Sequence, residues 1–305
     1  MNDNADREVS RGTWMAAASF VLWGVMPLYW HALKSVPSLA IVLQRIVWSA
    51  LFVGAFLIWR DGRGWLRNVL VQPRLRVMLA TSGALIAFNW GLYIWAVNAG
   101  HVVETALGYF INPLLNVLIG VVFLRERLRP LQWLSVAIAG AGVLWLTFDY
   151  GRLPWIALAL AVSFALYGLI RKLAAVDSVT GLGVEGAYLL LPALFMLAWQ
   201  TGHGGSGFDQ GAWICGLLVV SGIVTALPLV GFAYAVRRVS LTSIGLMQYI
   251  APTLQFLLGV FVFHEAFDSA RLIGFVLIWV ALALFAGEGL LRTSAAAANK
   301  VTQPD

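Results

Sequence analysis

The sequence predicts an all-α integral membrane protein with ten transmembrane helices, arranged as two inverted five-helix repeats. Three observations support this. The 305 residues are 61% hydrophobic and only 11% charged, so they supply too little polar surface to coat a soluble globule. The chain contains ten apolar stretches long enough to cross a bilayer. Its second half also repeats part of its first half.

The ten predicted spans follow one another with short connectors, none of which could hold a separate soluble domain. The connector 60–75 contains a short amphipathic piece around 65–70. The first span is read as a retained helix rather than a cleaved signal, because its apolar run is long and no cleavage site follows it. Polar tails are expected at 1–13 and 292–305. The spans are 14–33, 38–59, 76–98, 102–124, 131–148, 153–171, 180–200, 212–235, 240–263 and 270–291.

Positive charge is distributed unevenly among the connectors. One alternate set, including both tails, holds 16 of the 20 Lys and Arg residues, whereas the other set holds three. Cytoplasmic loops carry such an excess, so both termini are expected in the cytoplasm. The bias also accounts for the pI of about 9.8 without nucleic-acid binding, which is not expected.

The internal repeat is visible without a gap. The stretch Ser82–Glu126 aligns with Ser221–Glu265 after a shift of 139 positions, with about 13 of roughly 45 positions identical against about 4 expected by chance. Five spans per half is an odd number, so the repeats 14–148 and 149–291 enter the membrane from opposite sides. Secondary transporters are commonly built this way, with the binding site where the halves meet. The alternative is a duplication retained only for stability.

Two equivalent spans, 102–124 and 240–263, carry polar side chains at matching positions. In the second span, Gln248 aligns with Tyr109 and Gln255 with Asn116, while Ala251 replaces Asn112. A polar face is costly toward lipid, so both faces are expected to point inward. There they could line a cavity or form interhelical hydrogen bonds. The first span's stripe has a 4, 3, 4 spacing and comprises Thr105, Tyr109, Asn112 and Asn116.

The same two spans each contain a proline near the middle, Pro113 and Pro252. A proline removes one helical hydrogen bond, and the freed carbonyl group needs another partner in the membrane. The pair could mark a hinge at the site or a static kink that improves packing.

Two charged residues lie within predicted spans. Arg45 is about 10 Å from the outer end of its span, at 1.5 Å per residue, and could hold an anionic substrate group or form a structural pair. Glu185 is the best candidate for proton coupling, because a buried carboxylate can relay protons. It could instead bond to Arg171, Lys172 or a neighbouring helix.

Asn89 lies in the middle of its span, with Tyr93 and several tryptophans close by in the sequence. Aromatic walls suit flat or apolar ligands. Tryptophans also form interfacial belts in membrane proteins, which is the alternative explanation for many of the 14 in this chain.

No motif indicates an enzyme or a motor. The ATP-binding G-x-x-x-x-G-K-[ST], the metalloprotease H-E-x-x-H and the hydrolase G-x-S-x-G are all absent. The four histidines are too scattered to suggest a metal site, and no cofactor is expected.

Several segments resemble the RarD proteins of the EamA family, within the drug/metabolite transporter superfamily. They are FVLWGVMPLYWHAL (20–33), QRIVWS (44–49), NWGLYIWAVN (89–98), LGYFINPLLNVLIGVVFLRERL (107–128), SFALYGLIRK (163–172), QYIAPTLQFLLGVFVFHE (248–265) and FVLIWVALALF (275–285). The resemblance implies ten helices in two inverted repeats, a permease function and the bacterial inner membrane. It supplies no agreed site residues.

The resulting hypothesis is a secondary transporter of small organic molecules that works by alternating access. Its candidate substrate-binding residues are Arg45, Asn89, Tyr93, Tyr109, Asn112, Asn116, Gln248 and Gln255, with Glu185 as the proton-coupling candidate. The alternative is a non-transporting membrane receptor or assembly component. Substrate, direction of transport, coupling ion and oligomeric state stay open.

Overall fold

A computed structural model of the chain describes residues 3–99, 101–150, 153–202, 207–262, 272–274, 276–285 and 287–288. This part of the chain is helical and contains no strand, which confirms the all-α prediction. The helices are α1 (Asp3–Ala32), α2 (Ser38–Asp61), α3 (Trp65–Leu70), α4 (Pro73–Asn98), α5 (Val102–Val122), α6 (Pro130–Tyr150), α7 (Trp155–Leu173), α8 (Ser178–Thr201), α9 (Ala212–Val236), α10 (Leu241–Met247) and α11 (Ile250–Phe261).

Helical residues lie at all ten predicted spans, and α3 confirms the short amphipathic piece. Among the described residues, six helices are both long and apolar enough to cross a membrane: α2, α4, α6, α7, α8 and α9. Shorter apolar helical stretches lie in α5, at Leu107–Val122, and at Leu272–Phe285. With so many apolar side chains on its outer surface, this bundle needs lipid around it.

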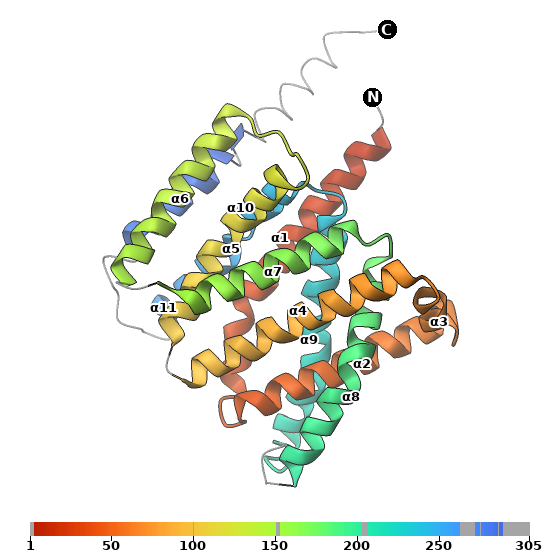
Figure 1. Ribbon diagram of the computed structural model, residues 1–305. Helices are drawn as coiled ribbons and strands as arrows, with labels where there is room; N and C mark the ends of the chain where they lie inside the picture. Colours follow the sequence, from red (N-terminus) through yellow and green to blue (C-terminus); the bar gives the residue numbers. More distant parts are fainter. Residues whose placement is uncertain are drawn as a thin grey trace.

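The helices pack in pairs that join the two halves (Figure 1). Helix α1 packs on α9, and α4 packs on α7; α5 packs on α7, and α1 packs on α10 and α11. Helix α2 packs on α8 as well as on α9, and α4 packs on α8. In the predicted repeat, α1 corresponds to α7 and α4 corresponds to α9. The contact of α1 with α9 is therefore the counterpart of the contact of α7 with α4.

Two glycines at equivalent repeat positions lie where these helices approach one another. Gly83 of α4 faces the backbone of Glu185 on α8, and a Cβ atom there would be 3.6 Å from its Cα. Gly222 of α9 lies directly against the backbone of Trp48 on α2, where a Cβ atom would overlap the carbonyl carbon. The α2–α9 contact is thus the closer of the two.

The ninth span is not one helix. Helix α10 ends at Met247 and α11 begins at Ile250, so the break lies one turn before Pro252. Proline has no N–H group, and the carbonyl oxygen of Gln248 accepts from Ala251 instead, at 3.3 Å. Helix α5 continues through its equivalent Pro113 without a break. The two prolines therefore have different local consequences.

Helix α6 lies at the edge of the bundle (Figure 1). Its buried Ala139 and Val143 pack in one apolar cluster with Ile278 and Ala281, from the last span. Helix α6 and the last span pack on each other, and the candidate site residues lie on other helices.

Candidate functional site

The polar stripe of α5 faces the protein interior, as its spacing predicts. Thr105, Asn112 and Asn116 are buried, with 2%, 5% and 0% of their surfaces exposed. Asn116 donates a hydrogen bond from Nδ2 to Oε1 of Gln248, at 2.6 Å, which joins α5 to the break between α10 and α11. Two of the predicted site residues, one from each half, are thereby brought into contact.

Two acceptor atoms in this stripe lack a protein partner. Within the described part of the chain, nothing donates a hydrogen bond to the side-chain oxygens of Asn112 and Asn116, although both atoms are buried. Leaving a buried acceptor unsatisfied costs about 1–3 kcal/mol. These oxygens are therefore ready to accept from water or from a polar ligand.

Two other predicted site residues tie helices together. Asn89 donates from Nδ2 to the carbonyl oxygen of Leu160, at 2.8 Å, and to the hydroxyl of Ser163, at 2.9 Å, so it links α4 to α7. Gln255 donates from Nε2 to the carbonyl oxygen of Trp23, at 3.2 Å, and links α11 to α1.

Arg45 lies in an aromatic cluster contributed by several helices. Its guanidinium carbon is 5.0 Å from the ring centre of Trp30 and 4.6 Å from that of Trp90. Its Nε donates to the hydroxyl of Thr225 on α9, at 3.0 Å. Among the described residues, no carboxylate forms an ion pair with Arg45. Stacking on indole rings lets the cation lie at membrane depth without a counter-ion.

Tyr93 and Tyr109 complete this cluster. Their rings meet edge to face with centres 6.1 Å apart, and both lie close enough to Arg45 to interact with it electrostatically. Although Tyr109 belongs to the inward stripe of α5, it is 41% exposed, and Tyr93 is 37% exposed. We call Trp30, Arg45, Trp90, Tyr93 and Tyr109 the Arg45 cluster; its exposed rings leave it accessible to a ligand.

Glu185 lies in a separate buried cluster. Ser82 of α4 donates to Oε1 of Glu185, at 2.5 Å, and NH1 of Arg171 is 3.5 Å from the same oxygen. Arg171, only 1% exposed, also donates from NH2 to the backbone oxygen of Ser178, at 2.9 Å. The sequence left open whether Glu185 pairs with Arg171, and the structure shows an ion pair between the two side chains. Arg45 and Glu185 do not pair.

A small cavity borders Glu185, with open space on the order of one water molecule. Trp90 lines this cavity and also lies against Arg45, so the cavity and the Arg45 cluster share this residue. The other lining residues come from both halves and are Ile46, Ser49, Ile86, Tyr167, Leu182, Gly186, Leu189 and Leu229.

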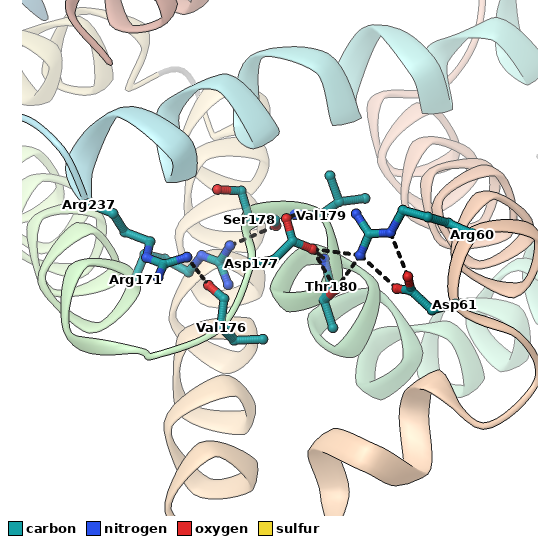
Figure 2. Close-up of polar contacts among 9 residues, drawn as sticks. All are labelled: Arg60, Asp61, Arg171, Val176, Asp177, Ser178, Val179, Thr180 and Arg237. Carbon is teal, nitrogen blue, oxygen red and sulfur yellow. Dashed lines mark hydrogen bonds and ion pairs between the residues drawn. The ribbon is translucent and has the colours of Figure 1, made fainter. Parts of the chain in front are cut away.

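At one end of the bundle, polar contacts join neighbouring helices, as Figure 2 shows. Arg60 at the end of α2 bonds to Asp61, to Asp177 at 2.9 Å and to Thr180 at 2.9 Å. Burial alone would raise the pKa of Asp177, but the hydrogen bonds from Thr180 and Arg60 lower it to about 2. The carboxylate also caps the first turn of α8 by accepting from Thr180 N, at 2.9 Å.

Further contacts extend this network, and we call this end of the bundle the basic end. Arg237 donates to the carbonyl oxygen of Val176, as Figure 2 shows. Lys172 donates to the carbonyl oxygens of Val236, at the end of α9, and of Val239, just beyond it, at 2.9 and 2.8 Å. Glu126 accepts from the backbone N–H groups of Leu241 and Thr242, at 2.7 and 3.0 Å, and so caps α10. Glu126 thus anchors α10 to the segment that follows α5.

Sequence reasoning found only part of the site. Arg171 was named as a possible partner of Glu185 but lies at the end of a predicted span, and the structure shows that its side chain is buried. Trp30 and Trp90 are among the tryptophans considered as aromatic walls, but their contact with Arg45 was not predicted, and Thr225 carried no signal that set it apart from packing residues. Two of the four histidines, His203 and His264, lie outside the described residues, as does Glu265 at the end of the aligned repeat.

The fold and the site together define a multi-pass membrane protein with polar groups buried between its two halves. The model of the EamA-like transporter family matches residues 10–148 and again 153–287. The chain therefore belongs to the EamA-like transporter family, as the resemblance implied.

Relatives in other bacteria have similar lengths. The chain is 45% identical to Protein RarD of Streptomyces exfoliatus over 287 residues, which cover 94% of this chain and 91% of that protein. It is 42% identical to Uncharacterized transporter YojE of Bacillus subtilis over 284 residues, 91% and 94% of the two chains. A solved crystal structure with 21% identity has the same fold, with a TM-score of 0.69 over 90% of this chain and 96% of that one. The chain is thus a RarD-like membrane transporter of the drug/metabolite transporter superfamily.

Proposed function

We propose that the protein is a secondary transporter of small organic molecules, rather than an enzyme, and that it works by alternating access. The observation that carries this proposal is the polar contact between Asn116 and Gln248, where two equivalent spans meet in the membrane beside unsatisfied acceptor oxygens. Polar groups at membrane depth are costly and commonly mark a substrate pathway.

The two halves would be inverted five-helix repeats, residues 14–148 and 149–291. Two family matches within one chain support this division. The exchanged helix pairs also support it, since α1 packs on α9 as α4 packs on α7. Repeats related by a two-fold axis in the membrane plane can exchange conformations and so open a central site to either side.

The arrangement fits a conformation that is closed at the basic end. Contacts of Arg60, Glu126 and Lys172 tie helices together there, while Tyr93 and Tyr109 stay accessible in the Arg45 cluster. The excess of Lys and Arg supports a cytoplasmic position for the basic end and for both termini. The central site would then open toward the outside, with the inner membrane as its location.

Glu185 is the proposed proton-coupling residue. It borders the central cavity, and its negative charge balances the buried Arg171. Protonation would remove that charge and leave Arg171 unpaired, so the helices α4, α7 and α8 would rearrange to satisfy it. In this mechanism Ser82 orients the carboxylate by donating to it.

Reconstitution into liposomes tests the transport function. Uptake from a mixture of labelled aromatic acids, amino acids and nucleosides is compared with uptake into empty liposomes. Asn112→Ala and Gln248→Ala should lower uptake at least about tenfold, since each removes a polar group from the proposed pathway. The control Lys34→Gln changes an exposed residue and should leave uptake unchanged.

Two outcomes would count against these assignments. Flux that both variants preserve would remove the polar stripe from the pathway. No flux of any solute would favour a receptor or an assembly component instead. Proton coupling is tested separately, because Glu185→Gln should make uptake independent of an imposed pH gradient while exchange continues.

A further inference from the structure

The Arg45 cluster contains a cation whose charge is unbalanced by the described residues. Its terminal nitrogens carry four of the five N–H groups of a guanidinium, and only Nε has a described partner, Thr225. Indole rings cover the guanidinium at 4.6 and 5.0 Å, which leaves its edge for an acceptor. An arginine presented in this way binds a carboxylate through two parallel hydrogen bonds.

The surroundings of Arg45 specify the rest of such a ligand. Tyr93 and Tyr109 keep 37% and 41% of their surfaces exposed, although they lie beside Arg45 and in contact with each other. Two accessible rings next to two indoles form an aromatic wall suited to a flat apolar group. No acidic side chain among the described residues has been placed in this cluster, so a ligand ammonium group would lack a partner.

We propose that the Arg45 cluster binds a flat organic monoanion, with its carboxylate on the terminal nitrogens of Arg45 and its apolar body against Tyr93 and Tyr109. This proposal names the substrate class of the transporter proposed above and rests on that function only where it concerns transport. Trp90 lies against Arg45 and also lines the cavity beside Glu185, so it contacts both the proposed anion site and that cavity.

Binding is tested on the purified full chain with four probes. Indole-3-acetate has the flat body and the carboxylate, indole-3-acetamide lacks the charge, tryptamine reverses it, and acetate lacks the flat body. Dissociation constants come from the ligand-dependent rise in the apparent unfolding temperature. The expected order places indole-3-acetate at least about tenfold tighter than each of the other three.

Substitutions in the Arg45 cluster test which side chains cause the preference for indole-3-acetate. Arg45→Gln should bind indole-3-acetate and its amide equally, and Arg45→Lys should keep only part of the preference because lysine cannot form the bidentate contact. Tyr93→Leu should weaken the acid and the amide together. The control Lys34→Gln removes a different cation, near the end of α1, and should bind the probes as the wild type does. The unfolding temperature without ligand shows whether each variant is folded.

Several results would overturn the proposal: no shift with indole-3-acetate, equal binding of the acid and the amide by the wild type, or an unchanged preference in Arg45→Gln. Should Arg45→Gln not fold, the wild-type probe series and Arg45→Lys still decide the matter. Flux of the same probes in liposomes separates the two proposals. Selective binding without flux would reject transport of the anion but keep the site, whereas flux without anion preference would reject the site.

Discussion

A methyl group added at Gly222 should weaken the protein, because the helices there are in backbone contact. A Cβ atom would overlap the carbonyl carbon of Trp48, and backbone atoms cannot turn aside as a flexible side chain can. Overpacking costs about 1–3 kcal/mol, while alanine in place of a helical glycine returns about 0.5–1 kcal/mol. We therefore expect Gly222→Ala to lower the free energy of unfolding by up to about 2 kcal/mol.

Gly83 is a matched control within the same chain. It occupies the equivalent repeat position, but its Cβ atom would lie 3.6 Å from the Cα of Glu185, an ordinary van der Waals distance. Without overlap, only the gain in helix propensity remains, about 0.5–1 kcal/mol. Gly83→Ala should thus be as stable as the wild type or slightly more stable.

The two variants are compared in detergent by heating, removing aggregates and measuring the folded fraction by size-exclusion chromatography. One kcal/mol shifts the unfolding midpoint by roughly 2–4 °C in a protein of moderate size. The helix-propensity gain is the same in both variants, so they differ by the overpacking cost alone, and the midpoint of Gly222→Ala should lie about 2–12 °C below that of Gly83→Ala. Equal midpoints, or the reverse order, would refute the reasoning from the α2–α9 approach.

Two further predictions concern the charged networks. The pKa of Asp177 is lowered to about 2, so its contribution to stability is present above the unfolded-state pKa of about 4 and is lost as the pH falls from there toward 2. Asp177→Asn should be modestly less stable than the wild type at pH 7, with a gap in unfolding temperature that closes toward pH 2; a gap independent of pH would contradict this. Glu185→Gln should destabilise by about 3–5 kcal/mol because it leaves the Arg171 charge buried without a counter-ion. Adding Arg171→Met should restore most of that loss, and a double variant as unstable as Glu185→Gln would count against the pair.

Much of the helix arrangement follows from hydropathy and from the repeat. Helical positions could be predicted because each apolar stretch must satisfy its own backbone groups in lipid. The inward face of α5 could be predicted too, since lipid excludes the polar stripe that contains Asn112 and Asn116. These arguments need only spacing and composition.

Partners and helix breaks could not be predicted in this way. Arg171 lay at a predicted span boundary, and an uncertainty of a few residues there decides between solvent and a buried ion pair with Glu185. Pro113 and Pro252 are equivalent in sequence, yet only the second has a break before it, so proline alone does not decide the break. The Trp30 and Trp90 contacts to Arg45 depend on tertiary packing, which no spacing within one helix reveals.

The interruption at Gln248 divides one span between two neighbours. Helix α10 is packed mainly on α5, whereas α11 is packed mainly on α1. Any sliding of α5 relative to α1 must therefore be taken up by the short joint that separates α10 from α11. Gln248 lies at that joint and accepts from Asn116, so a molecule that competes for its amide would act on the protein where α5 meets this joint.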